Sequence, residues 1–354
     1  MIPSPESIDA AWLTEQLQTA GHDTKVQSFT AEKIGTGQIG LCIRYRLTCT
    51  GDIKNVPTSL VGKFPSTDPQ SRSTGVSLRN YIKEVSFYRE MARHVSINTP
   101  RCYFAEIEGE GPEFMLLLED LAPARQGDQL TGCSVDVARA AVMELVGLHA
   151  PMWNDESLND LPFLKGPPEE PGAFKALYMM LLTGFLGRYG EHLSPPQQDI
   201  LTRFGEGLDA FRAAPSSVFS PIHIDYRLDN IMIDDRGEPP IITVVDWQSV
   251  TTGNPITDVG YFLGSGLLPE VRREVEEEIV RGYHDGLLST GITGYDFNEC
   301  WQDYRRAAFA GFTVAVIASM LVEQTPRGDE MFIAMTSRHT QHAIDLGADE
   351  FLEG

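Results

Sequence analysis

The segment from residue 220 to 263 constrains this chain more than any other stretch. It predicts two short apolar strands, at 231–233 and 241–245, joined by a tight turn that contains one glycine and two prolines. Polar residues stand before the first strand and after the second: Asp225, Asn230 and Asp246. Because a hairpin brings the start of its first strand beside the end of its second, we expect these side chains to converge.

Two carboxylates and an amide in this arrangement suit phosphoryl transfer. That reaction needs Mg²⁺ to neutralise polyphosphate oxygens, and a carboxylate to orient and deprotonate the attacking hydroxyl. Mg²⁺ is held by a few carboxylate or amide oxygens together with phosphate and water. We therefore expect Asn230 and Asp246 to bind Mg²⁺ and Asp225 to act as the catalytic base. The alternative, polar residues that merely form the turn, is adopted for Asp234 and Asp235.

The pattern H-x-D-x-x-x-x-N, followed by an apolar strand and Asp246, resembles the catalytic and metal loops of the protein-kinase-like fold. Trp247-Gln248 and the later G-N-P-x-x-D-x-x-Y-F-L are similar to the aminoglycoside phosphotransferase/choline kinase superfamily, and most closely to its ecdysteroid-kinase-like branch. This resemblance implies that His223 and Asp258 support the catalytic loop rather than take part in the chemistry.

Two departures from the related patterns affect the same region. Ile224 stands where the superfamily usually has glycine. Trp247-Gln248 replaces the Phe-Gly that lets protein kinases switch, so no such switch is expected. Only a few residues separate Asp246 from G-N-P, which leaves no room for an activation segment ending in A-P-E and disfavours a protein kinase.

Gly35, Gly37 and Gly40 form a G-x-G-x-x-G pattern near the start of the chain. A dinucleotide-binding fingerprint needs a helix after it, but here apolar and polar residues alternate, which predicts a strand. Strand, glycine loop and strand is the kinase-like order, in which backbone amides cover nucleotide phosphates. The alternative is a simple hairpin turn.

Lys63 lies at the centre of an apolar strand and therefore needs a charged partner. The family resemblance assigns this partner to Glu84, which lies on the next helix in the pattern Y-x-x-E-x-x-F-Y, and implies that Lys63 holds the α and β phosphates. Glu90 is a competing partner, and a pair of solvated charges is the plain alternative.

The resemblance also predicts the organisation of the chain. It implies an α+β, two-lobed protein-kinase-like fold, with an antiparallel sheet and one key helix in the N-terminal lobe and a mainly helical C-terminal lobe. The lobes are expected at 1–118 and 124–354, with a hinge at 119–123. At this hinge the Glu119 carbonyl and the Leu121 amide would meet the adenine edge.

Apolar helices are expected where this superfamily places its substrate-binding elements. The segments 174–189 and 195–211 precede the catalytic loop, and their methionines and aromatics could be either core or acceptor pocket. The segment 296–322 is predicted to be one helix, hydrophobic all round in its second half. His149, at the end of another helix, is interpreted as a structural residue.

Composition disfavours nucleic acid, anionic lipid and zinc as partners of this chain. The net charge of −22 disfavours a basic nucleic-acid-binding surface and attachment to anionic lipid. Five cysteines without a C-x-x-C pair favour neither a zinc site nor disulfides, and fit a reducing cytoplasm. No stretch predicts a signal peptide or a membrane span.

The sequence therefore predicts an ATP:alcohol O-phosphotransferase that uses ATP and Mg²⁺ and acts on a small-molecule hydroxyl. The branch resemblance favours an apolar, steroid-like or other alcohol as acceptor. A cationic acceptor such as an aminoglycoside or choline is the alternative that the acidic charge would suit. A regulatory pseudokinase is a third possibility, which the complete set of Lys63, Asp225, Asn230 and Asp246 disfavours.

Overall fold

The computed structural model describes residues 2–35, 39–51, 54–166 and 170–352. The chain forms two compact units, each assembled from separate stretches of sequence. The N-terminal unit comprises Met1–Arg93, Thr99–Pro123 and Asp246–Ser249. The C-terminal unit comprises His94–Asn98, Ala124–Val245 and Val250–Gly354. The predicted lobes were contiguous in sequence, whereas each compact unit takes a short segment from the other half of the chain.

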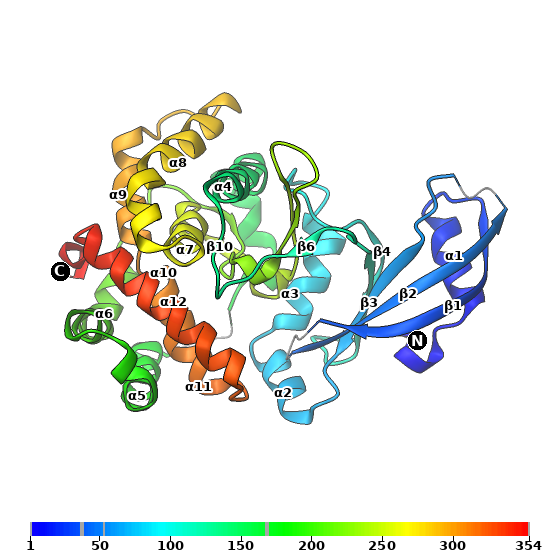
Figure 1. The fold of residues 1–354 in the computed structure, drawn as a ribbon, viewed down its shortest axis with the longest axis horizontal. Coiled ribbons are helices and arrows are strands. Elements are labelled where there is room, and N and C mark those ends of the chain that lie inside the picture. The colour runs from blue at the N-terminus through cyan, green and yellow to red at the C-terminus, as the bar shows by residue number, and fades with distance from the viewer. Residues whose placement is uncertain (1, 36–38, 52–53, 167–169, 353–354) are drawn as a thin grey trace. The chain divides into compact units, whose positions relative to one another are not determined.

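The N-terminal unit is built on a five-stranded antiparallel sheet in the order β1-β2-β3-β5-β4 (Figure 1). Its strands are β1 (Thr24–Ile34), β2 (Gly40–Gly51), β3 (Ser59–Pro65), β4 (Cys102–Ile107) and β5 (Phe114–Glu119). Its helices are α1 (Ala10–Thr19), α2 (Pro69–Ser77) and α3 (Asn80–Ser86), which continues as one π-helical turn, η2 (Phe87–Met91).

Strand β5 explains how this sheet is covered on both faces. Its apolar side chains alternate, because successive residues of a strand point to opposite faces. Met115 and Leu117 join the cluster that includes Leu13 of α1, whereas Leu116 joins the cluster that includes Val85 of α3. The first five residues of β5 are buried in consequence.

The C-terminal unit contains two small sheets and most of the helices. One sheet has the order β6-β8-β9, and the other pairs β7 with β10. The strands are β6 (Arg125–Gln126), β7 (Ser220–Ile222), β8 (Ile231–Asp234), β9 (Ile241–Val244) and β10 (Thr251–Gly253). Ile231 pairs with Val244, and Val245 N–H donates to the Asn230 carbonyl at 3.0 Å. The predicted hairpin is thus confirmed.

Helix α7 is the central helix of this unit, since all but one of its residues are buried. The helices are α4 (Val135–His149), α5 (Ala173–Tyr189), α6 (Pro195–Ala213), α7 (Ile256–Gly266), α8 (Pro269–Ser289), α9 (Phe297–Ala307), α10 (Ala310–Thr313), α11 (Ser319–Leu321) and α12 (Pro326–Asp345). Figure 1 shows α4, α8, α9 and α12 around α7, in agreement with their contacts. Among the described residues, no helix is long and apolar enough to cross a membrane.

The prediction of a single helix at 296–322 was wrong. This segment divides into α9, α10, a π-helical turn η9 (Val314–Ala318) and α11. A Cβ atom on Gly311 would overlap the ring of His339, so α12 approaches the segment as closely as a backbone allows. An apolar pattern with no single face does not specify such a contact, and packing against α12 sets the local geometry instead.

Asp120, which follows β5 at the end of the N-terminal sheet, is a carboxylate with several hydrogen-bond donors. Its side chain is 3% exposed and accepts hydrogen bonds from Arg44 Nε at 2.6 Å, Arg44 Nη2 at 3.1 Å and Ser59 Oγ at 2.6 Å. Burial opposes ionisation, but the bonds from Arg44 and Ser59 hold the pKa of Asp120 below its usual value. Asp120 therefore stabilises the folded state as a carboxylate.

Replacing Asp120 with Ala should destabilise the N-terminal unit by about 2–3 kcal/mol, because the partly buried Arg44 would lose its less exposed carboxylate partner and keep only Glu32, and Ser59 would lose its acceptor. Asp235→Ala is the control. Its partner Arg125 and Asp235 itself are both more than half exposed, so its loss should cost less than about 1 kcal/mol. Thermal unfolding measures both. Because the folded pKa is depressed, the Asp120 contribution should be complete at neutral pH and decline below about pH 4. Equal effects of the two variants would contradict this account.

Candidate active site

Lys63 lies between two carboxylates inside the N-terminal unit. Leu60 and Phe64 of β3 belong to the α1 face of the sheet, so Lys63 projects toward α3. Its Nζ lies 2.7 Å from Glu84 Oε1 and 2.9 Å from Asp246 Oδ1. Glu90, the competing partner, is exposed.

The electrostatics of this group favour a permanently charged lysine. Burial opposes the charge, but Asp246 and Glu84 together raise the pKa of Lys63 well above its usual value. Burial raises the pKa of Glu84, against the opposing effect of Lys63. The side chain of Asp246 is 28% exposed, compared with 2% for Glu84, so the more accessible side of the lysine is the side of Asp246.

Trp247 anchors Asp246 in the N-terminal unit. The indole ring is fully buried and stacks on Phe87, with centroids 3.8 Å apart and planes 7° apart. Its Nε1–H donates to Thr99 Oγ1 at 2.9 Å. Asp246 itself has a φ of +68°, a left-handed conformation that Asp adopts more readily than most residues. The large aromatic residue after Asp246 therefore acts as a buried anchor.

The predicted nucleotide-binding backbone is partly described. Gly35 has a φ of +71°, and a Cβ on Gly40 would lie 3.1 Å from Lys63 Cε, so Gly40 passes close beside the lysine. Gly37 falls outside the described residues.

At the predicted hinge, Glu119 exchanges hydrogen bonds with the backbone of Arg101, whereas the Leu121 N–H has no partner within the described ranges.

In the C-terminal unit, Asp225 is held by three donors. Its Oδ1 accepts from Arg227 Nε at 3.0 Å and from the Tyr261 hydroxyl at 2.9 Å. Its Oδ2 accepts from Asn230 Nδ2 at 2.8 Å. The Asp225 side chain is 18% exposed, so the carboxylate is oriented by its neighbours yet remains accessible.

Asp258 secures the loop that carries Asp225. This carboxylate is fully buried at the start of α7 and accepts from the backbone N–H of His223 at 2.6 Å and of Ile224 at 2.9 Å. His149 Nε2 lies 3.4 Å from the same carboxylate, and its Nδ1 lies 2.7 Å from the Tyr283 hydroxyl. His223 Nε2 donates to the carbonyl of Val245 at 3.1 Å, which ties the loop to the end of the hairpin.

The residues expected to bind Mg²⁺ belong to different units: Asn230 to the C-terminal unit and Asp246 to the N-terminal unit. Asn230 uses its amide nitrogen on Asp225, so its Oδ1 has no donor among the described residues and could serve as a ligand. Within those residues, no three His, Cys, Asp or Glu side chains form a group that could hold a metal. An amide oxygen and a carboxylate are each of the type that Mg²⁺ takes beside phosphate and water, and the binding of one ion by both residues stays a prediction.

Two residues of this region, Arg227 and Tyr261, were missed by sequence reasoning. Arg227 and Tyr261 both contact Asp225, and His149 contacts Asp258. Arg227 and Tyr261 lie inside the quoted motifs, but nothing in residue type or spacing shows which carboxylate they reach. His149 was interpreted as structural, and its burial with two polar partners is compatible with that role.

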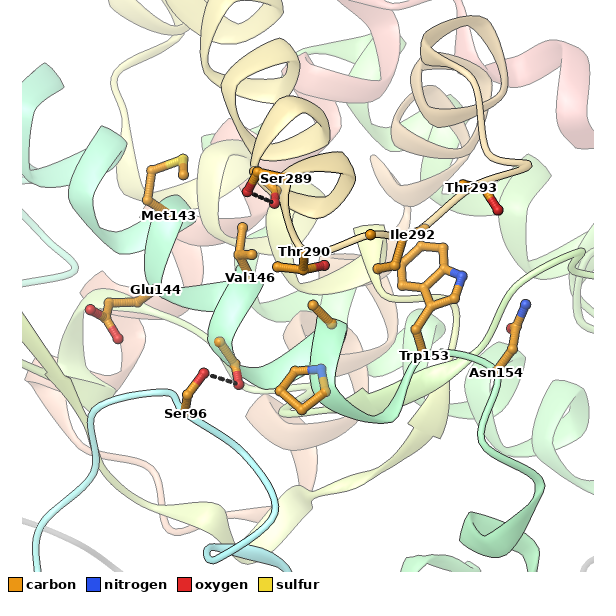
Figure 2. Close-up of a pocket in the computed structure, with 15 residues that line it drawn as sticks. Ser96, Met143, Glu144, Val146, Trp153, Asn154, Ser289, Thr290, Ile292 and Thr293 are labelled. Carbon is orange, nitrogen blue, oxygen red and sulfur yellow. Dashed lines mark hydrogen bonds between the residues drawn. The ribbon is translucent and has the colours of Figure 1, made fainter.

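A cavity of about 850 Å³ lies elsewhere in the C-terminal unit, between α4 and the end of α8 (Figure 2). Figure 2 shows Met143 and Val146 from α4 facing Ser289, the last residue of α8, and Thr290, which follows it. None of the predicted site residues lines it. The hydroxyl of Ser289 already donates to the backbone carbonyl of Gly286 at 2.6 Å.

Comparison with known proteins gives a family and a fold. The model of the family described as "Phosphotransferase enzyme family" matches residues 65–309, a range that begins just after Lys63 and includes Glu84, Asp225, Asn230 and Asp246. No curated protein is detectably similar in sequence to the chain.

Several solved kinases and phosphotransferases share the fold at low sequence identity. A choline kinase from Cryptosporidium parvum Iowa II has a TM-score of 0.56 and 11% identity, with coverage of 98% of this chain and 100% of that one. A Plasmodium vivax ethanolamine kinase has a TM-score of 0.51 and 11% identity over 91% and 85%. Wild-type aminoglycoside 2'-phosphotransferase-IIIa, as its GDP complex, has a TM-score of 0.52 and 14% identity over 96% and 100%. The predicted α+β, protein-kinase-like fold is confirmed.

Ile224 generates a prediction about backbone strain. Its φ is +69°, where a β-branched residue is rare and a Cβ costs about 1–2 kcal/mol. Ile224→Gly should therefore be more stable than Ile224→Ala by about 0.5–1 kcal/mol, after allowing for the greater chain entropy of glycine. At Ile222, which lies in β7, the order should reverse. Chemical denaturation of the four variants measures this. An alanine variant more stable than glycine at position 224 would contradict the strain.

Proposed function

The chain belongs to the phosphotransferase enzyme family, and we propose that it is a small-molecule kinase that transfers the γ-phosphate of ATP to a hydroxyl group. The observation that carries this proposal is the ion-pair group of Lys63 with Glu84 and Asp246. A lysine kept charged in a largely buried position, beside a more exposed carboxylate, suits a site for polyphosphate and its metal ion.

The proposed chemistry assigns a role to each of the predicted site residues. Asp225 accepts the proton of the acceptor hydroxyl as its oxygen attacks the γ-phosphorus. Lys63, fixed by Glu84, neutralises charge on the phosphates, and the glycine loop covers them. Asn230 and Asp246 would hold Mg²⁺, which supplies further neutralisation of phosphate charge when bound. His223 and Asp258 hold the loop that carries the base.

Nucleotide recognition is proposed to use backbone groups. The Leu121 N–H, which has no partner in the described part of the chain, would donate to the adenine edge, and the Glu119 carbonyl would accept from it. The phosphotransferase with a similar fold was solved with GDP, so the preference between ATP and GTP needs a direct comparison.

Thermal unfolding with and without Mg-ATP, followed by phosphate-transfer assays, tests this function. Mg-ATP at about 100 times its Kd should stabilise the wild type by about 2.7 kcal/mol, and Asp246→Ala should lose most of this gain. Asp225→Ala should keep the gain but lose at least about a hundredfold in kcat. Asp235→Ala, from the exposed turn of the same hairpin, is the control and should resemble the wild type.

The outcomes separate the candidate functions. A wild type that Mg-ATP does not stabilise would overturn the nucleotide site. Stabilisation without transfer to any of a panel of acceptors would favour a nucleotide-binding regulatory protein. The panel contains a hydroxysteroid, a long-chain primary alcohol, choline, ethanolamine and kanamycin.

We further propose an apolar alcohol as acceptor, in keeping with the ecdysteroid-kinase-like resemblance. Helix α5 is apolar all round, and its Met180 is 65% exposed. The helix packs against η9 and α11, where Leu321 is 45% exposed. Helix α12 packs on the same elements, and its Met331 Sδ accepts from Arg227 Nη1 at 3.0 Å. Helix α12 therefore packs near the exposed apolar residues Met180 and Leu321 and also contacts Arg227, the neighbour of Asp225.

A cationic acceptor is the second candidate, because choline and ethanolamine kinases share the fold and the chain carries a net charge of −22. Recognition of a cation needs a carboxylate that is not already neutralised. Near Asp225, Asp229 Oδ2 lies 2.9 Å from Arg227 Nη1, and Asp128 lies 3.5 Å from Arg327. These arginines compensate the carboxylates, which favours the apolar acceptor.

Met180→Glu tests the acceptor class. It should raise the KM for the hydroxysteroid or the long-chain alcohol about tenfold, because a charge would replace apolar surface. The KM for Mg-ATP should not change. Leu288→Glu, at an exposed apolar site near the end of α8, is the matched control and should leave both constants within twofold of the wild type. Choline as the preferred substrate, with no effect of Met180→Glu, would reject the apolar assignment.

A further inference from the structure

The two carboxylate oxygens of Asp225 have different surroundings. A carboxylate oxygen accepts about two hydrogen bonds. Oδ1 receives two donors, Arg227 Nε and the Tyr261 hydroxyl, and is therefore saturated. Oδ2 receives only Asn230 Nδ2, so it keeps one acceptor position within the described residues.

Tyr261 is well placed to maintain this asymmetry. It lies within the buried helix α7, its side chain is fully buried, and its ring lies 5.2 Å from that of His339 on α12. Burial raises the pKa of Tyr261 well above its usual value, so its hydroxyl remains a donor. Because the phenol is enclosed by packed residues, its hydrogen bond opposes rotation of the Asp225 carboxylate.

Arg227 supports the same oxygen from the loop. Its Nε donates to Asp225, while its Nη1 lies 2.9 Å from Asp229 Oδ2 and 3.0 Å from Met331 Sδ. The guanidinium is planar, so the contacts made through Nη1 also hold Nε in place. One oxygen of the base is thus fastened by two rigid donors from separate elements.

We propose that Tyr261 and Arg227 are positioning residues that occupy Oδ1 of Asp225 and leave Oδ2 to take the proton of the acceptor. This inference rests on the proposed kinase function. The acceptor O–H bond breaks and its proton passes to Oδ2. The acceptor oxygen bonds to the γ-phosphorus, the bond from that phosphorus to the β,γ-bridging oxygen breaks, and ADP leaves. Without the two donors the carboxylate would rotate, and Oδ2 would face the hydroxyl of a bound acceptor in a smaller fraction of molecules.

Tyr261→Phe tests the proposal, with Tyr226→Phe as the matched control. Tyr226 is also fully buried, but its hydroxyl donates to the carbonyl of Ala141 at 2.7 Å rather than to Asp225. The rate is measured with Mg-ATP and the panel alcohol that the wild type turns over, or water if no alcohol reacts. Tyr261→Phe should lower kcat about tenfold with the KM for Mg-ATP within twofold of the wild type. Tyr226→Phe should leave kcat within twofold, and both variants should unfold at similar temperatures.

Arg227→Lys is a second variant at a partly exposed residue, and should lower kcat in the same way. A kcat for Tyr261→Phe within twofold of the wild type, or an equal loss in Tyr226→Phe, would overturn the positioning role while leaving the kinase function intact. If Tyr261→Phe does not fold, Arg227→Lys decides by the same criterion. A wild type that transfers phosphate neither to an alcohol nor to water would overturn the role of Asp225 and this inference with it.

Discussion

The N-terminal unit depends on how it accommodates the largely buried charge of Lys63. Lys63 projects from the sheet toward α3, and a charge there is tolerated only beside carboxylates. Glu84 on α3 and Asp246 supply them, at 2.7 and 2.9 Å. This requirement ties α3 and the distant segment Asp246–Ser249 to the same sheet. Trp247, stacked on Phe87, adds the apolar contact that keeps the segment in place. Two adjacent residues of this short segment therefore hold it in place: Asp246 by its ion pair with Lys63, and Trp247 by its packing on Phe87.

The C-terminal unit has a corresponding buried carboxylate at Asp258. It accepts two consecutive backbone N–H groups, and these bonds favour the left-handed conformation of Ile224 that a β-branched residue otherwise avoids. The strained residue directly precedes Asp225, whose carboxylate emerges beside Arg227 and Tyr261. The buried carboxylate of Asp258 therefore holds the backbone that carries the partly exposed Asp225. A side chain that must meet a substrate in a defined orientation needs such support.

Much of the fold could be predicted because the relevant signals are local. The period-2 alternation of the early strands, the hairpin around residues 231–244 and the amphipathic helix α4 each follow from a few neighbouring residues. The segment 296–322 was mispredicted because its second half is apolar on every side, so the residue pattern there does not mark where a helix ends. Its α10 part packs against His339 of α12 at Gly311, a contact between residues far apart in the chain. The polar motifs identified Asp225 and Asn230 as candidates, but Tyr261, which contacts the same carboxylate, looks in sequence like an ordinary core residue.

By itself, the sequence determined the chemical types available, most of the strands and helices that carry them, and the hairpin whose strands lie between Asn230 and Asp246 in the chain. Local side-chain periodicity and turn residues suffice for these features. Only the tertiary structure decided that Asp246–Ser249 packs with the N-terminal unit and that Lys63 bonds to Asp246 as well as to the predicted partner Glu84. It also decided that Oδ1 of Asp225 is saturated while Oδ2 is not. These outcomes depend on burial and hydrogen-bond geometry between residues far apart in the chain, which no local pattern encodes.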